Sequence, residues 1–169
     1  DEQGDDRLGL AGSSYQMLVS GALAGRPPRV DFDLERAVQT LLRRAIAAGL
    51  LASAHDSSDG GLAVALAESS IASGLSVDLR FDLPSEGLAR ALFAEGGARV
   101  AISVKAECRQ QWDQMAAESM VPITELGVVT DGSEFRIQCG DRDVQLSVAD
   151  LKRAHQEGLT RRIGGEAES

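Results

Sequence analysis

The chain has 169 residues, 43% hydrophobic and 25% charged, a balance typical of one globular domain with a sizeable core. Its formal net charge of −9 argues against a nucleic-acid partner, because phosphate backbones bind surfaces with an excess of positive charge. No apolar run approaches the roughly 20 residues of a membrane span. Cys108 and Cys139 are far apart and lack the companions of a zinc or disulfide motif. We therefore expect no membrane partner and a reduced, cytoplasmic setting.

The first third of the chain predicts two helices. Ser13 can cap a short helix within residues 13–25, which ends before Pro27 and Pro28. Asp33 is expected to cap a strong helix over residues 34–49. Its apolar face is formed by Leu34, Val38, Leu41, Leu42, Ala45 and Ile46, and Gly49 suits its C-terminal end.

The remainder alternates between strand and helix patterns. We expect a short buried strand over 50–54, a helix over 61–73, a half-buried strand over 75–81, a short helix over 86–93, a strand over 98–104 and an amphipathic helix over 107–119. Three short strands over 123–129, 133–139 and 143–148 are expected to form a meander with turns at Asp131-Gly132 and Gly140-Asp141, before a last helix over 149–163. This order predicts an α/β (α+β type) fold, a mixed β-sheet covered by helices.

The stretch "SAHDSSDGG", residues 53–61, carries the polar residues that suggest chemistry. Backbone N–H groups at a helix start attract phosphate, and small residues such as Gly60 and Gly61 let it approach. Hydroxyls can donate to phosphate oxygens, and carboxylates can hold a bridging Mg²⁺. The predicted phosphate contacts are Ser57, Ser58, Gly60 and Gly61, and the predicted metal ligands are Asp56 and Asp59.

A structural interpretation of the same loop stays open. Asp59 can cap the following helix while the glycines only shape the turn. His55 is expected to orient or pack the loop and not to catalyse a reaction, and His155 is expected to lie on the solvated face of the last helix.

The extended motif "SAHDSSDGGLAVALAE" resembles the signature of the last domain of the phosphoribosylformylglycinamidine synthase family. "LGLAGSSYQMLVSG" is similar to the Leu-Gly-Gly-Ser-Glu-Tyr segment of that family, from which Ala11 and Ser14 depart. "LFAEGGARVAISV" matches its Leu-Phe-x-Glu-x-x-x-Arg strand entry, and "ITELGVV" its Ile-Gly-x-Val. The resemblance covers residues 8–162, leaving 1–7 as a disordered or chain-end segment and 163–169 as a flexible tail.

The resemblance implies a C-terminal domain related to aminoimidazole ribonucleotide synthetase, within an ATP-dependent ligase of purine biosynthesis. It implies no catalytic residue in this chain, so the isolated domain is expected to be inactive. ATP and Mg²⁺ serve the whole enzyme, and in long forms the residue matching Asp56, with Asp59 second, helps hold an auxiliary nucleotide. The implied partners are the N-terminal remainder of the enzyme, a glutaminase subunit and a small accessory subunit.

Two other functions stay open. The chain can be a non-catalytic scaffold or interaction domain whose loop serves only the fold. It can also be the matching domain of another superfamily member, such as a hydrogenase-maturation protein, although "SDGG" lacks the Thr of those relatives. A domain cut from a larger enzyme is expected to expose apolar surface, most of all over residues 8–32.

Overall fold

The computed structural model describes residues 9–164, so the expectations for residues 1–7 and for 165–169 lie outside the described residues. The chain divides into two compact units, Asp1–Leu66 with Glu86–Glu125, and Ala67–Ser85 with Leu126–Ser169. In the part described, no helix combines the length and the apolar character needed to cross a membrane. The predicted α/β class is confirmed, since helices and a mixed sheet are both present.

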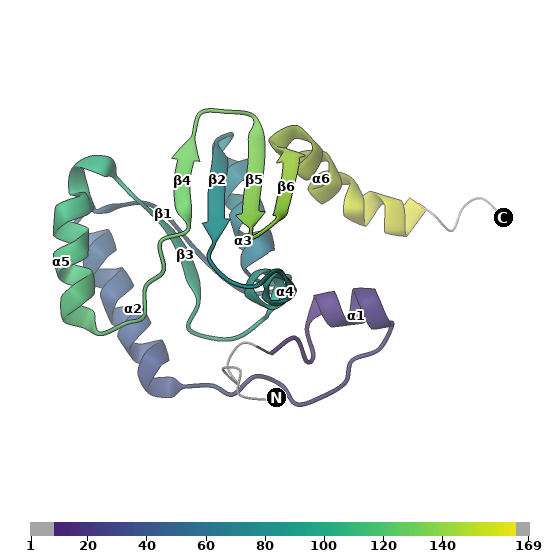
Figure 1. Cartoon of the computed structure of the whole chain (residues 1–169), viewed down its shortest axis with the longest axis horizontal. Coiled ribbons are helices and arrows are strands. Elements are labelled where there is room, and N and C mark those ends of the chain that lie inside the picture. The colour runs from purple at the N-terminus through teal and green to yellow at the C-terminus, as the bar shows by residue number, and fades with distance from the viewer. Residues whose placement is uncertain (1–8, 165–169) are drawn as a thin grey trace. The chain divides into compact units, whose positions relative to one another are not determined.

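The first unit is built from helices and a two-stranded antiparallel sheet. Its elements are α1 (Ser14–Ser20), α2 (Phe32–Ala47), β1 (Leu51–Asp56), the start of α3 (Gly61–Ser73), α4 (Leu88–Phe93), β3 (Val100–Val104) and α5 (Arg109–Ser119). Helices α2 and α5 lie side by side (Figure 1). They bury Leu41, Ala45 and Trp112 together with Leu50, and this cluster is the core of the unit.

Helix α2 begins two residues earlier than the sequence suggested, so the cap prediction was wrong. Asp31 is the last extended residue, and its carboxylate accepts the N–H of Leu34 at 3.0 Å. Asp33 instead lies inside the first turn, where a negative charge favours the helix dipole but cannot cap it. The predicted end is confirmed, because Gly49 has a φ of +70°.

Strand β1 was predicted correctly as a strand and wrongly as buried. Ala52, Ser53 and Ala54 are exposed. The physical reason is that β1 pairs with β3 alone in a two-stranded sheet, with Ala54 opposite Ile102. Its small side chains therefore remain at the surface of the unit.

The second unit is a four-stranded mixed sheet. Its elements are the end of α3, β2 (Ser76–Phe81), β4 (Gly127–Thr130), β5 (Glu134–Cys139), β6 (Arg142–Ser147) and α6 (Val148–Gly164). The strand order is β4-β2-β5-β6, as Figure 1 shows, and only the β2–β5 pair is parallel. Helix α6 extends one residue beyond the predicted helix at each end, from Val148 to Gly164.

The predicted meander was therefore wrong at its first turn. Strand β2 lies between β4 and β5, because its alternating apolar residues Val77, Leu79 and Phe81 are buried at the centre of the sheet. The Asp131-Gly132 connection passes the end of β2, where the buried Ser76 hydroxyl donates to the Glu134 carbonyl. The second turn is confirmed, since β5 and β6 form an antiparallel hairpin across Gly140-Asp141.

The described part of the segment predicted over 8–32, residues 9–32, exposes apolar side chains as predicted. Leu18 is 82% exposed and Phe32 74%. Met17, Val19, Leu23 and Val30 are also exposed. Six of the large apolar side chains that are exposed among the described residues thus lie in this segment.

Gly127→Ala tests the unexpected pairing of β4 with β2. Gly127 has a φ of +150°, and an added Cβ would lie 2.0 Å from the Asp78 carbonyl oxygen of β2. We expect the free energy of unfolding to fall by about 1–3 kcal/mol in urea titrations. Gly158→Ala is the control, because its Cβ meets nothing within 4 Å in α6, and it is expected to be neutral or slightly stabilising. A Gly127→Ala chain as stable as this control would contradict the observed strand order.

Candidate functional site

The loop Ser57–Gly60 connects the end of β1 to the start of α3. The predicted order of strand, loop and helix is confirmed, and Gly61 begins the helix as predicted. The strand, however, continues to Asp56, two residues beyond its predicted end at 54. A strand, a short polar loop and a helix start thus follow one another within a few residues. This arrangement places the predicted metal and phosphate residues on the loop and on the two residues that flank it, Asp56 and Gly61.

The two predicted metal ligands lie at the surface. The Asp56 side chain is 77% exposed, and its Oδ1 lies 3.9 Å from His55 Nδ1. Asp59 is exposed as well. Within residues 9–164 no group of three or more His, Cys, Asp or Glu side chains is arranged to hold a metal ion. The loop thus offers one or two carboxylates and no complete metal cage.

The two serines differ in what they present to solvent. Ser58 is exposed. The Ser57 hydroxyl oxygen is shielded from solvent and has no hydrogen-bond partner among the described residues. The Ser57 N–H donates to the Arg99 carbonyl at 2.9 Å, which fixes the first residue of the loop. Of the two predicted hydroxyl donors, Ser58 is the accessible one.

The backbone N–H groups of the two glycines already have acceptors. Gly60 N–H donates to Glu95 Oε1 at 2.7 Å, and Gly61 N–H donates to the Ser58 carbonyl at 2.9 Å. Gly61 has a φ of +69°, and a Cβ there would lie 2.7 Å from the Leu92 carbonyl oxygen. Glycine is thus required at position 61 by the close approach of α4. A phosphate group that bound the Gly60 N–H would first displace Glu95.

Glu95 is the residue of this site that sequence reasoning missed. Its Oε1 accepts the Ser14 N–H at 2.9 Å in addition to that of Gly60. Burial acts to raise the pKa of Glu95, but the two backbone donors prevail and lower it below its ordinary value. The available signal was the Leu-Phe-x-Glu-x-x-x-Arg pattern, in which Glu95 and Arg99 are the polar positions.

The neighbours of Glu95 hold its segment in place. Phe93 stacks on Tyr15 with ring centroids 4.8 Å apart and an interplanar angle of 11°. The Arg99 guanidinium donates to the carbonyl oxygens of Ala91 at 2.7 Å and Ala94 at 3.4 Å, at the end of α4. Burial lowers the pKa of Arg99 from its ordinary value. Contacts of Phe93 and Arg99 therefore fix the backbone on both sides of Glu95.

The two histidines lie in different places. His55 Nδ1 is 2.8 Å from the carbonyl oxygen of Asp56, so the ring contacts the backbone of the loop entry. His155 is 55% exposed at its side chain and lies 3.9 Å from Glu68 Oε1. The orienting position expected for His55 fits this contact, and His155 lies on a partly solvated helix face as expected.

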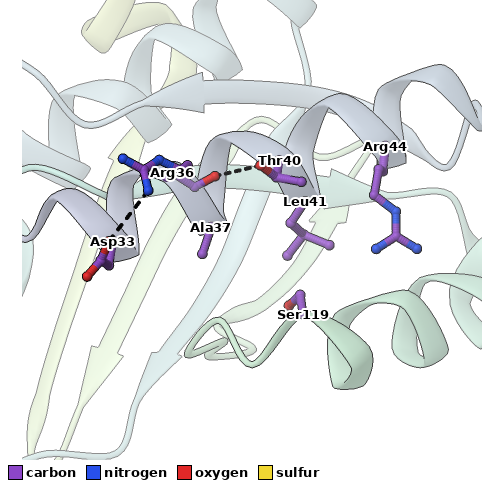
Figure 2. A pocket seen from close by; sticks show the side chains of 7 residues that line it. All are labelled: Asp33, Arg36, Ala37, Thr40, Leu41, Arg44 and Ser119. Atoms are coloured by element: carbon purple, nitrogen blue, oxygen red, sulfur yellow. Dashed lines mark hydrogen bonds and ion pairs between the residues drawn. The ribbon is translucent and has the colours of Figure 1, made fainter.

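A separate surface depression of about 280 Å³ lies beside α2. Figure 2 shows its lining residues, which are Asp33, Arg36, Ala37, Thr40, Leu41, Arg44 and Ser119. Arg36 pairs with Asp33 at 3.7 Å, and Arg44 pairs with Glu118 at 3.5 Å. Because both cations have carboxylate partners, the depression lacks the unbalanced positive charge of an anion site. It shares no residue with the acidic loop.

Comparison with known proteins identifies relatives of the whole chain. A family model described as AIR synthase related protein, C-terminal domain, matches residues 4–140. The chain is 83% identical over 169 residues to the phosphoribosylformylglycinamidine synthase subunit PurL of Parasynechococcus marenigrum. It is 56% identical, over 97% of its length, to PurL of a Synechococcus strain. In each case it spans 22% of the relative, or about a fifth of its length.

Solved structures resemble the fold at lower identity. PurL of Thermotoga maritima complexed with ATP has a TM-score of 0.61 and 17% identity, covering 69% of this chain and 21% of that one. The structure of PurLQS from the same organism has a TM-score of 0.62 and 17% identity, covering 84% and 24%. These likenesses confirm the predicted fold.

The lowered pKa of Glu95 predicts how its contribution to stability depends on pH. The ionised carboxylate is the stronger acceptor, so its contribution is full above about pH 4.3, the ordinary value of an unfolded glutamate. It is lost as pH falls through the lower folded value. We expect wild type to be more stable than Glu95→Gln near neutral pH and the difference to shrink below about pH 4. Urea unfolding of both chains from pH 7 to pH 3 measures this, and a pH-independent difference would contradict the geometry.

Proposed function

This chain belongs to the AIR synthase related protein, C-terminal domain family, and from that membership we propose that it acts as the C-terminal domain of a phosphoribosylformylglycinamidine synthase. The proposed enzyme is an ATP-dependent ligase of purine biosynthesis that converts formylglycinamide ribonucleotide to formylglycinamidine ribonucleotide. The observation that carries the proposal is the 83% identity to a PurL subunit over all 169 residues. The Thermotoga maritima PurL structures with ATP and with FGAR support the substrates proposed.

The proposed activity belongs to the longer protein. The chain corresponds to 22% of its PurL relatives, and none of its residues is assigned a catalytic role. In the proposed reaction ATP phosphorylates the amide oxygen of the substrate, and ammonia then displaces phosphate. Chemistry of this kind depends on neutralising and positioning phosphate groups. The contribution proposed for this chain is a folded support that carries the acidic loop.

We propose that the loop meets a nucleotide through Mg²⁺ held by Asp56, with Asp59 second. The donors fit this ion, because Mg²⁺ binds hard oxygen ligands and commonly takes one or two carboxylates, several waters and phosphate oxygens. Both carboxylates are exposed, whereas the N–H groups of Gly60 and Gly61 have intrachain acceptors. Contact through the carboxylates therefore requires no rearrangement. Phosphate contacts from Ser57, Ser58, Gly60 and Gly61 stay a prediction.

The exposed apolar side chains over residues 9–32 support a partner within the same enzyme. Leu18 and Phe32 are both more than 70% exposed, and exposed apolar patches typically mark interfaces. We propose that the preceding part of the synthase covers this segment. The PurLQS structure of Thermotoga maritima supports two further partners for the whole enzyme, a glutaminase subunit and a small accessory subunit. A cytoplasmic location is part of the same proposal.

The isolated chain is expected to form no formylglycinamidine ribonucleotide from ATP, ammonia and formylglycinamide ribonucleotide. The reason is that the chain matches only a fifth of the length of its PurL relatives. Product formation is measured by chromatography, with the complete synthase as the positive control. Turnover by the purified chain, free of complete enzyme, would overturn the proposed division of roles.

Asp56→Ala in the complete synthase tests the metal role. Removing one of two carboxylates leaves Mg²⁺ with a weaker anchor, so we expect Mg-ADP to bind at least about tenfold more weakly in calorimetric titrations. Asp33→Ala is the matched control, because Asp33 is an exposed aspartate of α2 outside the loop, and it is expected to bind as wild type does. Equal affinities for Asp56→Ala and wild type would assign the loop a purely structural role, as in the scaffold alternative.

A further inference from the structure

We infer that Glu95 is a positioning residue for the acidic loop: by accepting the N–H groups of Ser14 and Gly60, it sets where the loop carboxylates stand. The inference rests on the proposed nucleotide role of the loop. It assigns a role to Glu95, which that proposal does not include. It also gives a physical role to the Leu-Phe-x-Glu-x-x-x-Arg pattern of residues 92–99.

The segment Glu95–Arg99 holds the loop at both of its ends. The Arg99 carbonyl accepts the N–H of Ser57, the first loop residue, at 2.9 Å. The Glu95 carboxylate accepts the N–H of Gly60, the last loop residue, at 2.7 Å. Asp59 lies between these two attachments and Asp56 directly precedes them. The position of both carboxylates therefore depends on one short segment that is distant in sequence.

The same segment is itself held firmly. The oxygen that binds Gly60 also binds the Ser14 N–H at 2.9 Å, across 81 positions of sequence. Next to these bonds, Tyr15 and Phe93 stack with centroids 4.8 Å apart. A carboxylate whose backbone is fixed by neighbours on both sides can hold the loop in one place.

The length of the Glu95 side chain decides whether both bonds can form, whereas its charge only strengthens them. A glutamine has the same reach, and its amide oxygen can accept both N–H groups. An aspartate keeps the charge but is shorter by one methylene, so it cannot make both bonds from the same backbone position. The variants Glu95→Gln and Glu95→Asp therefore separate positioning from electrostatics.

The test measures Mg-ADP affinity and hydrogen–deuterium exchange of the peptide spanning residues 57–61 in the complete synthase. We expect Glu95→Asp to weaken Mg-ADP binding about tenfold, the effect typical of removing a residue that orients a ligand. Its loop peptide should exchange faster than wild type. Glu95→Gln should stay within about threefold of wild type in affinity and keep the protection of the loop. Glu107→Asp, an exposed glutamate outside the loop and its contacts, is the matched control and should change neither.

Two results would overturn the inference. One is loop exchange in Glu95→Asp equal to that of wild type, and the other is a loss of affinity in Glu95→Gln as large as in Glu95→Asp. Failure of the proposed function gives a different pattern. In that case Asp56→Ala would bind Mg-ADP as wild type does, while Glu95→Asp would still speed exchange of the loop. That result would show that Glu95 stabilises the loop but has no role in nucleotide binding.

Discussion

A single carboxylate oxygen connects three segments that are far apart in the sequence of this chain. Glu95 Oε1 accepts the N–H of Ser14 at the start of α1 and the N–H of Gly60 before α3. Each donor is a backbone group at or beside a helix start, where N–H groups lack intrahelical acceptors. The carboxylate therefore satisfies two donors that the helices leave open. The position of the acidic loop depends on these two bonds.

That constraint changes how the loop is interpreted chemically. A glycine pair before a helix suggests free N–H groups for phosphate. Here an internal carboxylate accepts the Gly60 N–H, and Gly61 is glycine because α4 approaches closely. What the loop presents outward is the Asp56 and Asp59 carboxylates. A cation between loop and phosphate is thus the physically consistent way for an acidic loop to meet an anionic nucleotide.

Local patterns predicted most helices and strands, and non-local contacts explain the errors. Apolar periodicity predicts helix α2, and a glycine at position 49 predicts its end. The capping residue is Asp31 and not the predicted Asp33, because the cap needs an extended backbone as well as an aspartate. The predicted pairing of the three last strands was wrong because strand order depends on burial, and β2 lies between β4 and β5. The loop residues were proposed as a site from their chemistry, whereas the role of Glu95 was not predicted. The Leu-Phe-x-Glu-x-x-x-Arg pattern marks Glu95, but its partners lie 35 and 81 positions away and the pattern does not identify them.

The central claim is that Glu95 holds the loop in place while the exposed carboxylates of Asp56 and Asp59 contact the nucleotide through Mg²⁺. A crystal structure of the complete synthase with Mg-ADP tests it most directly. The account predicts that Glu95 still accepts the Gly60 N–H and that Mg²⁺ joins Asp56 to a phosphate oxygen. A structure in which Glu95 is turned away and a phosphate group sits on the Gly60 N–H would contradict it.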